Sequence, residues 1–142
     1  MTYDYRKQKI VAVINENLPT WQMLNVIGHL SISLGAHKDE DLMGESILID
    51  ASNIEHKGIA RYGFIIKKGS TENIRDILKN AKDTKEITVI DFPREMLEIS
   101  DDDSLVESMS KKEEKDFEYF GILIYGPSET VNRLTKGVVM FS

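Results

Sequence analysis

Hydrophobic residues along this chain occur in two patterns: short continuous runs, and longer segments with an apolar residue every three or four positions. A continuous run rich in β-branched residues is typical of a strand buried on both faces of a sheet. The clearest run is Lys9-Ile-Val-Ala-Val-Ile14, and Tyr119-Phe-Gly-Ile-Leu-Ile-Tyr125 is the next clearest. Weaker runs predict strands at residues 46–49, 62–67, 87–90 and 138–141, with residues 54–61 as an edge strand or hairpin arm.

Segments with helical periodicity lie between these runs. Pro19 and Thr20 open the first helix, and Gly35 is expected to end it at about Leu34. Further helices are predicted to begin at residues 69–72 and to occupy residues 93–97, 107–116 and 128–135. Because strands alternate with helices, the pattern indicates an α/β fold with a largely parallel sheet covered on both faces. We expect one domain spanning residues 1–142.

The first predicted helix carries a stripe of uncharged polar residues. At about 100° per residue, Gln22, Asn25, His29 and Ser33 fall within about 80° of one another. Two interpretations stay open: an ordinary solvent-facing surface, or the lining of a cleft or subunit contact. His29 is suited to act as an acid, a base or a hydrogen-bond donor near neutral pH.

Composition narrows the function classes. The formal net charge is −6, and a nucleic-acid partner is therefore not expected, because phosphate neutralisation by basic residues supplies most of that affinity. There is no cysteine, and the three histidines lack metal-ligand spacing, so no metal site is expected. No dinucleotide or phosphate loop is present, and we expect no cofactor. No apolar segment is long enough for a signal peptide or a membrane span, so a cytoplasmic protein is the default expectation.

Three segments taken in order resemble a known family. They are residues 9–19 with Leu24-Asn-Val-Ile-Gly-His-Leu30, then Val89-Ile-Asp-Phe92, and then residues 119–127 with Leu134-Thr-Lys-Gly137. Together they resemble the uncharacterised bacterial family known as domain of unknown function two thousand, over nearly the whole chain. That family is in turn similar, more distantly, to the type II peptidyl-tRNA hydrolases.

The resemblance to the hydrolases implies a fold and a candidate site. The implied fold is a three-layer α/β/α sandwich with a mixed, mostly parallel sheet. His29 matches a helix histidine of the hydrolases, Asp91 and Arg94 match their Gln-Asp-x-x-Arg segment, and Thr135 loosely matches their Val-Thr-Gly element. On this basis, His29 and Asp91 are expected to approach each other across one cleft and are the candidate catalytic residues.

Two departures argue against cleavage of peptidyl-tRNA. The hydrolases carry a lysine at the entry to the first helix, and residues 19–23 contain none, so a cation that stabilises an oxyanion is missing. Glu95 follows the arginine where the hydrolases have threonine, and it is expected to repel a phosphate backbone.

Three functions remain in competition. The first is a binding domain that holds a small polar ligand or a peptide end. Its predicted ligand-binding residues are Gln22, Asn25, His29, Asp91, Arg94 and Thr135. The second is a hydrolase of a small ester or amide that uses His29 and Asp91. The third is a structural domain that forms a homodimer or larger homo-oligomer. No membrane partner is expected.

Overall fold

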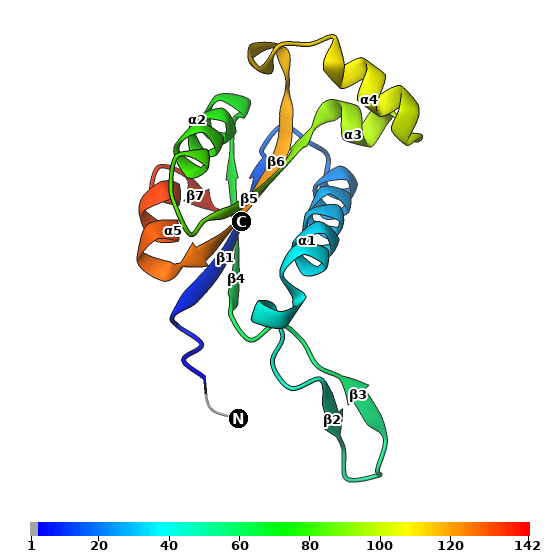
Figure 1. The fold of residues 1–142 in the computed structure, drawn as a ribbon, viewed down its shortest axis with the longest axis vertical. Coiled ribbons are helices and arrows are strands. Elements are labelled where there is room, and N and C mark those ends of the chain that lie inside the picture. The colour runs from blue at the N-terminus through cyan, green and yellow to red at the C-terminus, as the bar shows by residue number, and fades with distance from the viewer. Residues whose placement is uncertain (1–2) are drawn as a thin grey trace.

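The computed structural model describes residues 3–142, apart from the side chains of residues 39–41. Its main sheet has five strands in the order β5-β6-β1-β4-β7 (Figure 1). Their bounds are β1 Gln8–Asn15, β4 Gly63–Gly69, β5 Thr88–Pro93, β6 Tyr119–Pro127 and β7 Val139–Met140. The two clearest apolar runs of the sequence are therefore β1 and β6, and they lie side by side inside the sheet.

The direction of the strands corrects one prediction. The sheet is mixed, as expected, but the prediction of mostly parallel pairing is wrong, because only β1 and β4 pair in parallel. The pairs β1–β6, β5–β6 and β4–β7 are antiparallel. The physical reason is the connection from β5 to β6. Its helices lie beyond one end of the sheet instead of crossing back over a face, so the chain re-enters the sheet in the opposite direction (Figure 1).

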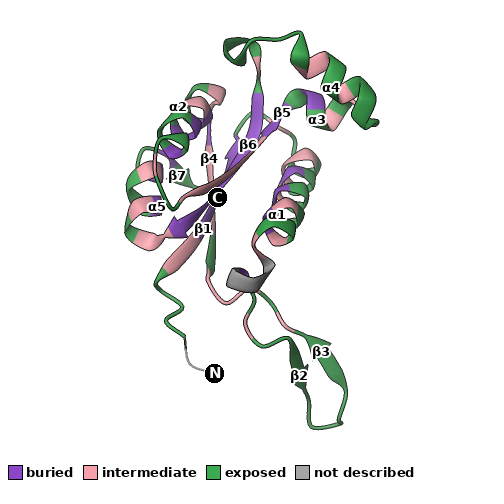
Figure 2. Ribbon diagram, viewed as in Figure 1, coloured by how far each residue is buried: buried purple, intermediate pink, exposed green. Residues whose placement is uncertain are grey.

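Helices cover both faces of the sheet, as expected. Their bounds are α1 Thr20–Leu42, α2 Thr71–Lys82, α3 Arg94–Glu98, α4 Asp102–Ser110 and α5 Ser128–Thr135, with a 3-10 turn at Glu114–Asp116. One apolar cluster joins α1 to the sheet through residues such as Leu30 and Phe92. The other joins α2 and α5 to the opposite face through residues such as Ile74 and Val131. Figure 2 shows the buried residues of α1 and α2 on the sides that face the sheet, whereas α4 has no buried residue.

Helix α1 is longer than the sequence indicates. Gly35 was expected to end it, but the helix continues to Leu42 with one irregular residue, Lys38 (φ −140°, ψ 26°). No glycine has a positive φ in the part of the chain that the structure describes. Gly35 is therefore an ordinary helical residue and not a left-handed cap. The start of α2 agrees with the sequence, because Ser70 caps it and forms a reciprocal capping box with Asn73.

The predicted second strand forms a separate hairpin. Strands β2 Ile47–Ile49 and β3 Glu55–Lys57 pair with each other and stay outside the main sheet, and all six of their residues are exposed. Figure 1 shows this hairpin projecting away from the sheet near the end of α1. Among the described residues, no helix is long and apolar enough to cross a membrane.

Candidate functional site

A groove lies between α1 and the edge strand β5 and has a volume of about 690 Å³. We call it the β5 groove. Its α1 wall is formed by His29, Leu30, Ser33, His37 and Lys38. The rest of its lining consists of residues 88–92 of β5, Met96 of α3 and Leu105 of α4. The groove therefore combines an apolar lining with a few polar groups from one helix, which is the usual composition of a ligand site.

The edge of β5 itself borders this groove. Five consecutive residues, from Thr88 to Phe92, line it. Side chains alternate between the two faces of a strand, so consecutive residues share one groove only when the backbone edge also faces it. Strand β5 ends the strand order, and no further strand of the described chain pairs with its outer edge. The groove thus presents backbone donors and acceptors as well as side chains.

The two histidines of the groove are held differently. The ring of His29 lies 6.0 Å from the ring of Phe92, measured between centroids, at an interplanar angle of 43°. The Nδ1 of His37 lies 2.7 Å from the carbonyl oxygen of Ser33 and donates to it. This bond leaves the Nε2 of His37 for a ligand. Both side chains are exposed enough to reach one.

The structure separates His29 from Asp91. Both residues border the groove, but Ile90 and Phe92 pack in the α1-side cluster while Val89 packs in the α2-side cluster. By alternation, the carboxyl of Asp91 points with Val89, away from His29. The register agrees, because Asp91 lies opposite Ile122 of the α2-side cluster. Desolvation raises the pKa of Asp91, and the charge of Lys82 of α2 opposes that rise. The prediction that the two side chains meet across one cleft is wrong.

The other predicted residues do not converge on the groove either. Gln22 and Asn25 lie on earlier turns of α1, outside the groove lining. Arg94 forms ion pairs with Glu98 (2.6 Å) and Glu118 (3.0 Å). Thr135 is fully buried in α5, and its hydroxyl donates to the carbonyl of Val131 at 2.8 Å. Of the six predicted ligand-binding residues, only His29 therefore places its side chain in the groove. Asp91 borders the groove through the backbone edge of β5.

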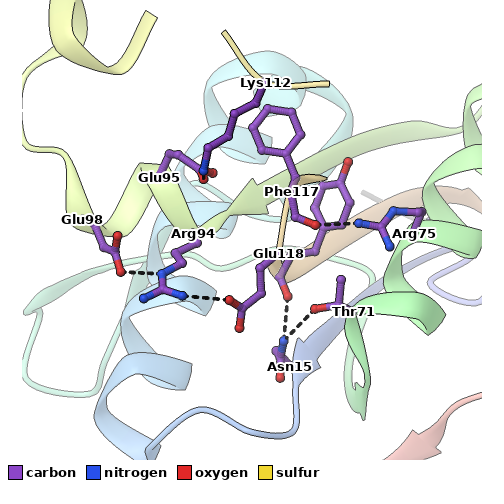
Figure 3. Close-up of polar contacts among 10 residues, drawn as sticks. Asn15, Thr71, Arg75, Arg94, Glu95, Glu98, Lys112, Phe117 and Glu118 are labelled. Carbon is purple, nitrogen blue, oxygen red and sulfur yellow. Dashed lines mark hydrogen bonds and ion pairs between the residues drawn. The ribbon is translucent and has the colours of Figure 1, made fainter. Parts of the chain in front are cut away.

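A polar cluster that the sequence did not indicate lies at the carboxyl end of β1 (Figure 3). Its centre is Asn15, which is 2% exposed. The Asn15 amide donates to the carbonyl of Tyr119 at 2.8 Å and to the hydroxyl of Thr71 at 3.2 Å. Its side-chain oxygen accepts from the backbone N–H of Asn17 at 2.9 Å. Asn15 therefore ties β1, β6 and the start of α2 together.

An arginine completes this cluster. Arg75 donates to the carbonyl of Phe117 at 2.6 Å and pairs with Glu114 at 3.0 Å. Its guanidinium also lies 5.5 Å from the centroid of the Tyr119 ring. Burial first, and then the carboxylate of Glu114, raises the pKa of Tyr119 to about 12. These groups bind one another, so the cluster stabilises the end of the sheet.

Glu95 lies near the same end of the sheet, but its contacts differ from those that the sequence predicted. It is 5% exposed, and its Oε1 accepts from the Nζ of Lys112 at 2.5 Å (Figure 3). A side chain that is buried and paired with a lysine does not repel a phosphate backbone. The sequence-based argument from Glu95 against tRNA is therefore wrong, while the argument from net charge is unaffected.

Comparisons with known proteins identify a family whose description names no activity. The sequence model of a family described as "Protein of unknown function (DUF2000)" matches residues 8–142. A solved structure, a protein of unknown function from Agrobacterium tumefaciens strain C58, is similar with a TM-score of 0.84 and 20% identity. The alignment covers 96% of this chain and 98% of that one, and at this identity it shows a shared fold only. No curated protein matches the chain.

Proposed function

The chain belongs to the DUF2000 family, and we propose that it is a binding protein whose β5 groove holds an extended peptide segment. The observation that carries the proposal is the open backbone edge of β5 along the groove. A peptide that adds to a sheet edge gains main-chain hydrogen bonds for affinity, and alternate side chains gain pockets for specificity.

The groove lining favours a particular peptide chemistry. Ile90, Phe92 and Leu105 offer contacts for apolar side chains on one face of the added strand. The polar groups on the α1 wall are Ser33, two histidines and Lys38. The one acidic residue of the lining, Asp91, points to the other face. A segment with apolar side chains and one carboxylate, either an acidic side chain or a free C-terminus, matches this arrangement.

We propose that any relationship to the type II peptidyl-tRNA hydrolases is one of fold alone. A mixed sheet between helices is consistent with that relationship. Against a shared reaction stand the separation of His29 from Asp91 and the absence of a lysine at the entry to α1. We expect no turnover of peptidyl-tRNA at an ordinary enzyme rate of ~1–1000 per second. Turnover in that range would replace the binding proposal with a hydrolase.

Display of random peptides, some with free C-termini, tests the proposal on the intact chain. Peptides that enrich on the wild type are then measured by fluorescence anisotropy against Ser33→Trp, which fills the groove, and against His56→Ala, a control change at an exposed hairpin residue outside the groove. We expect Ser33→Trp to weaken binding at least about tenfold and His56→Ala to leave it unchanged. No enrichment, or equal binding to Ser33→Trp, would overturn the proposal.

Backbone methylation of a selected peptide separates strand addition from side-chain capture. Only alternate N–H groups of an added strand face the sheet edge. Methylating one alternate set of backbone nitrogens is therefore expected to abolish binding, while methylating the other set leaves most of the affinity. Equal losses for both sets would show that the peptide does not pair with β5.

A further inference from the structure

The part of α1 from Thr20 to His37 carries no Asp, Glu, Lys or Arg side chain, although 30% of the chain is charged. Three large apolar side chains on this surface are exposed: Trp21 (64%), Leu24 (64%) and Ile32 (72%). A surface helix usually places charged residues opposite its buried face. The composition of this part of α1 is instead that of a helix covered on both sides.

Two glycines lie among these apolar residues. At about 100° per residue, Trp21, Leu24, Gly28, Ile32 and Gly35 fall within about 80° of one another. We call this set the outer stripe. A Cβ atom at Gly28 or Gly35 would have no atom within 4 Å, so nothing inside the chain requires glycine there. Glycine destabilises a helix interior, and its usual benefit is close approach of another backbone.

We propose that the outer stripe pairs with the outer stripe of a second copy of this chain, antiparallel and with the two-fold axis at Gly28. Such an axis places residue i of one copy opposite residue 56 − i of the other. Leu24 then faces Ile32, and Gly28 faces Gly28. Trp21 faces Gly35, which leaves room for the large indole ring.

This self-complementarity favours a second copy over an unrelated partner. Large residues stand at equal spacing on both sides of Gly28, and the one aromatic residue falls opposite a glycine. The absence of charge removes like-charge repulsion across the axis. An isologous interface requires a surface that matches itself in this way.

The area involved indicates a reversible dimer. The three exposed apolar side chains offer on the order of 250 Å² per copy, taking ~200 Å² for a whole tryptophan and ~100 Å² for a leucine or isoleucine. The largest exposed apolar patch of a typical monomer is about 300–600 Å² and is often functional, while a standard interface buries about 800 Å² per partner. We therefore expect dissociation in the micromolar range. The outer stripe does not include the groove residues His29, Ser33 and His37, so the proposal is independent of peptide binding.

Sedimentation equilibrium of the intact chain from roughly 1 to roughly 500 µM tests the association. We expect a monomer–dimer equilibrium that Ile32→Glu weakens at least about tenfold. The matched control is Ile59→Glu, at an isoleucine that is 80% exposed beside the hairpin, and it is expected to leave the equilibrium unchanged. A monomer at every concentration, or an equal effect of Ile59→Glu, would overturn the proposal.

Disulfide trapping tests the antiparallel register, because the chain has no cysteine of its own. A disulfide forms readily only when the two Cα atoms lie about 4.4–6.8 Å apart. Leu24→Cys mixed with Ile32→Cys is expected to cross-link about tenfold faster than either variant alone, and Gly28→Cys to cross-link to itself. Faster self-linking of Leu24→Cys than of the mixture would show a different register and overturn the proposed axis.

Discussion

Helices α1 and α2 cover opposite faces of the same sheet, but their outward surfaces differ in kind. Both bury apolar residues against the strands. The outward surface of α2 is charged, with Glu72, Asp76 and Lys79 exposed, whereas that of α1 exposes Trp21, Leu24 and Ile32. The sequence of α2 is explained by the fold alone. That of α1 is not, and for this reason both proposed surfaces, the outer stripe and the β5 groove, involve α1.

The largest expected effect tests whether the inner sides of the two helices are equivalent. Leu30 of α1 is 1% exposed and Ile74 of α2 is 0% exposed. Leu30→Ala and Ile74→Ala are each expected to lower the free energy of unfolding by ~2–5 kcal/mol, because both leave a cavity. Denaturant melts at low protein concentration measure this. A loss below ~1 kcal/mol for Leu30→Ala alone would mean that α1 is loosely attached, and the comparison would fail.

The next effect contrasts buried and exposed polar groups. Asn15→Ala is expected to lower the free energy of unfolding by ~1–3 kcal/mol, because the carbonyl of Tyr119 and the N–H of Asn17 lose their partner. Gln22→Ala, Asn25→Ala and His29→Ala are expected to change stability by less than ~0.5 kcal/mol, because water can replace their contacts. The same melts measure all four. Losses for the α1 variants as large as that of Asn15→Ala would show that this surface is not open.

The sequence predicted the parts of the fold that depend on local pattern. The apolar runs of β1 and β6 encode burial directly, and Ser70 encodes the start of α2 through its capping chemistry. Strand direction was predicted wrongly, because the sheet is mostly antiparallel. The direction of β6 depends on where α3 and α4 pack, and the local pattern of apolar residues does not determine that position.

The candidate site was predicted only in part. The polar stripe left a solvent-facing surface and a cleft both open, and in the structure His29 and Ser33 line the groove while the rest of the stripe does not. Asp91 was assigned to the wrong face, since one residue of offset in a strand reverses the side chain. Asn15 was missed because its partners Thr71 and Tyr119 lie 56 and 104 residues away. Glu95 was misjudged because it is buried and its partner, Lys112, lies 17 residues further along the chain.

A smaller effect is expected at Gly28, where one substitution should change the stability of the monomer and the strength of the proposed dimer in opposite directions. Gly28→Ala is expected to raise the free energy of unfolding of the monomer by ~0.5–1 kcal/mol, because alanine favours the helix and has open space there. The same change is expected to weaken the dimer by separating the two backbones. Melts at low concentration and sedimentation at high concentration measure the two quantities. A variant that is more stable and associates as well as the wild type would leave the glycine unexplained by the proposed dimer.

Gly121→Ala is the matched control, at a glycine of β6 that faces the inner side of α1. A Cβ at Gly121 would lie 2.7 Å from Cγ1 of Val26 and 3.2 Å from Cδ1 of Leu30. We expect this alanine to destabilise the fold by ~1–3 kcal/mol through overpacking. The two glycine changes therefore differ in sign, because one glycine is required inside the chain and the other is not.

The smallest expected effect concerns Asp91, whose carboxyl points to the α2 side. Desolvation raises its pKa above the ordinary value of 3.8, so the folded state binds the proton more tightly than the unfolded state. Stability from this group is fully present below pH 3.8 and is lost as the pH rises through the folded-state pKa. Asp91→Asn keeps the shape and removes the charge. It is therefore expected to raise the melting temperature near pH 7 by about 2–4 °C and to lose this advantage as the pH falls toward 4.

Asp76→Asn on the exposed surface of α2 is the control, and it is expected to change the melting temperature little at either pH. The measurement is the melting temperature of the wild type, Asp91→Asn and Asp76→Asn, each at pH 7 and pH 4. An advantage for Asp91→Asn that is equal at both pH values would come from packing and not from the buried charge. A loss at pH 7 would mean that the Asp91 carboxylate is stabilised in the fold. The assignment of Asp91 to the closed, α2 side of the sheet would then be wrong, and its return to the β5 groove as a partner of His29 would have to be considered.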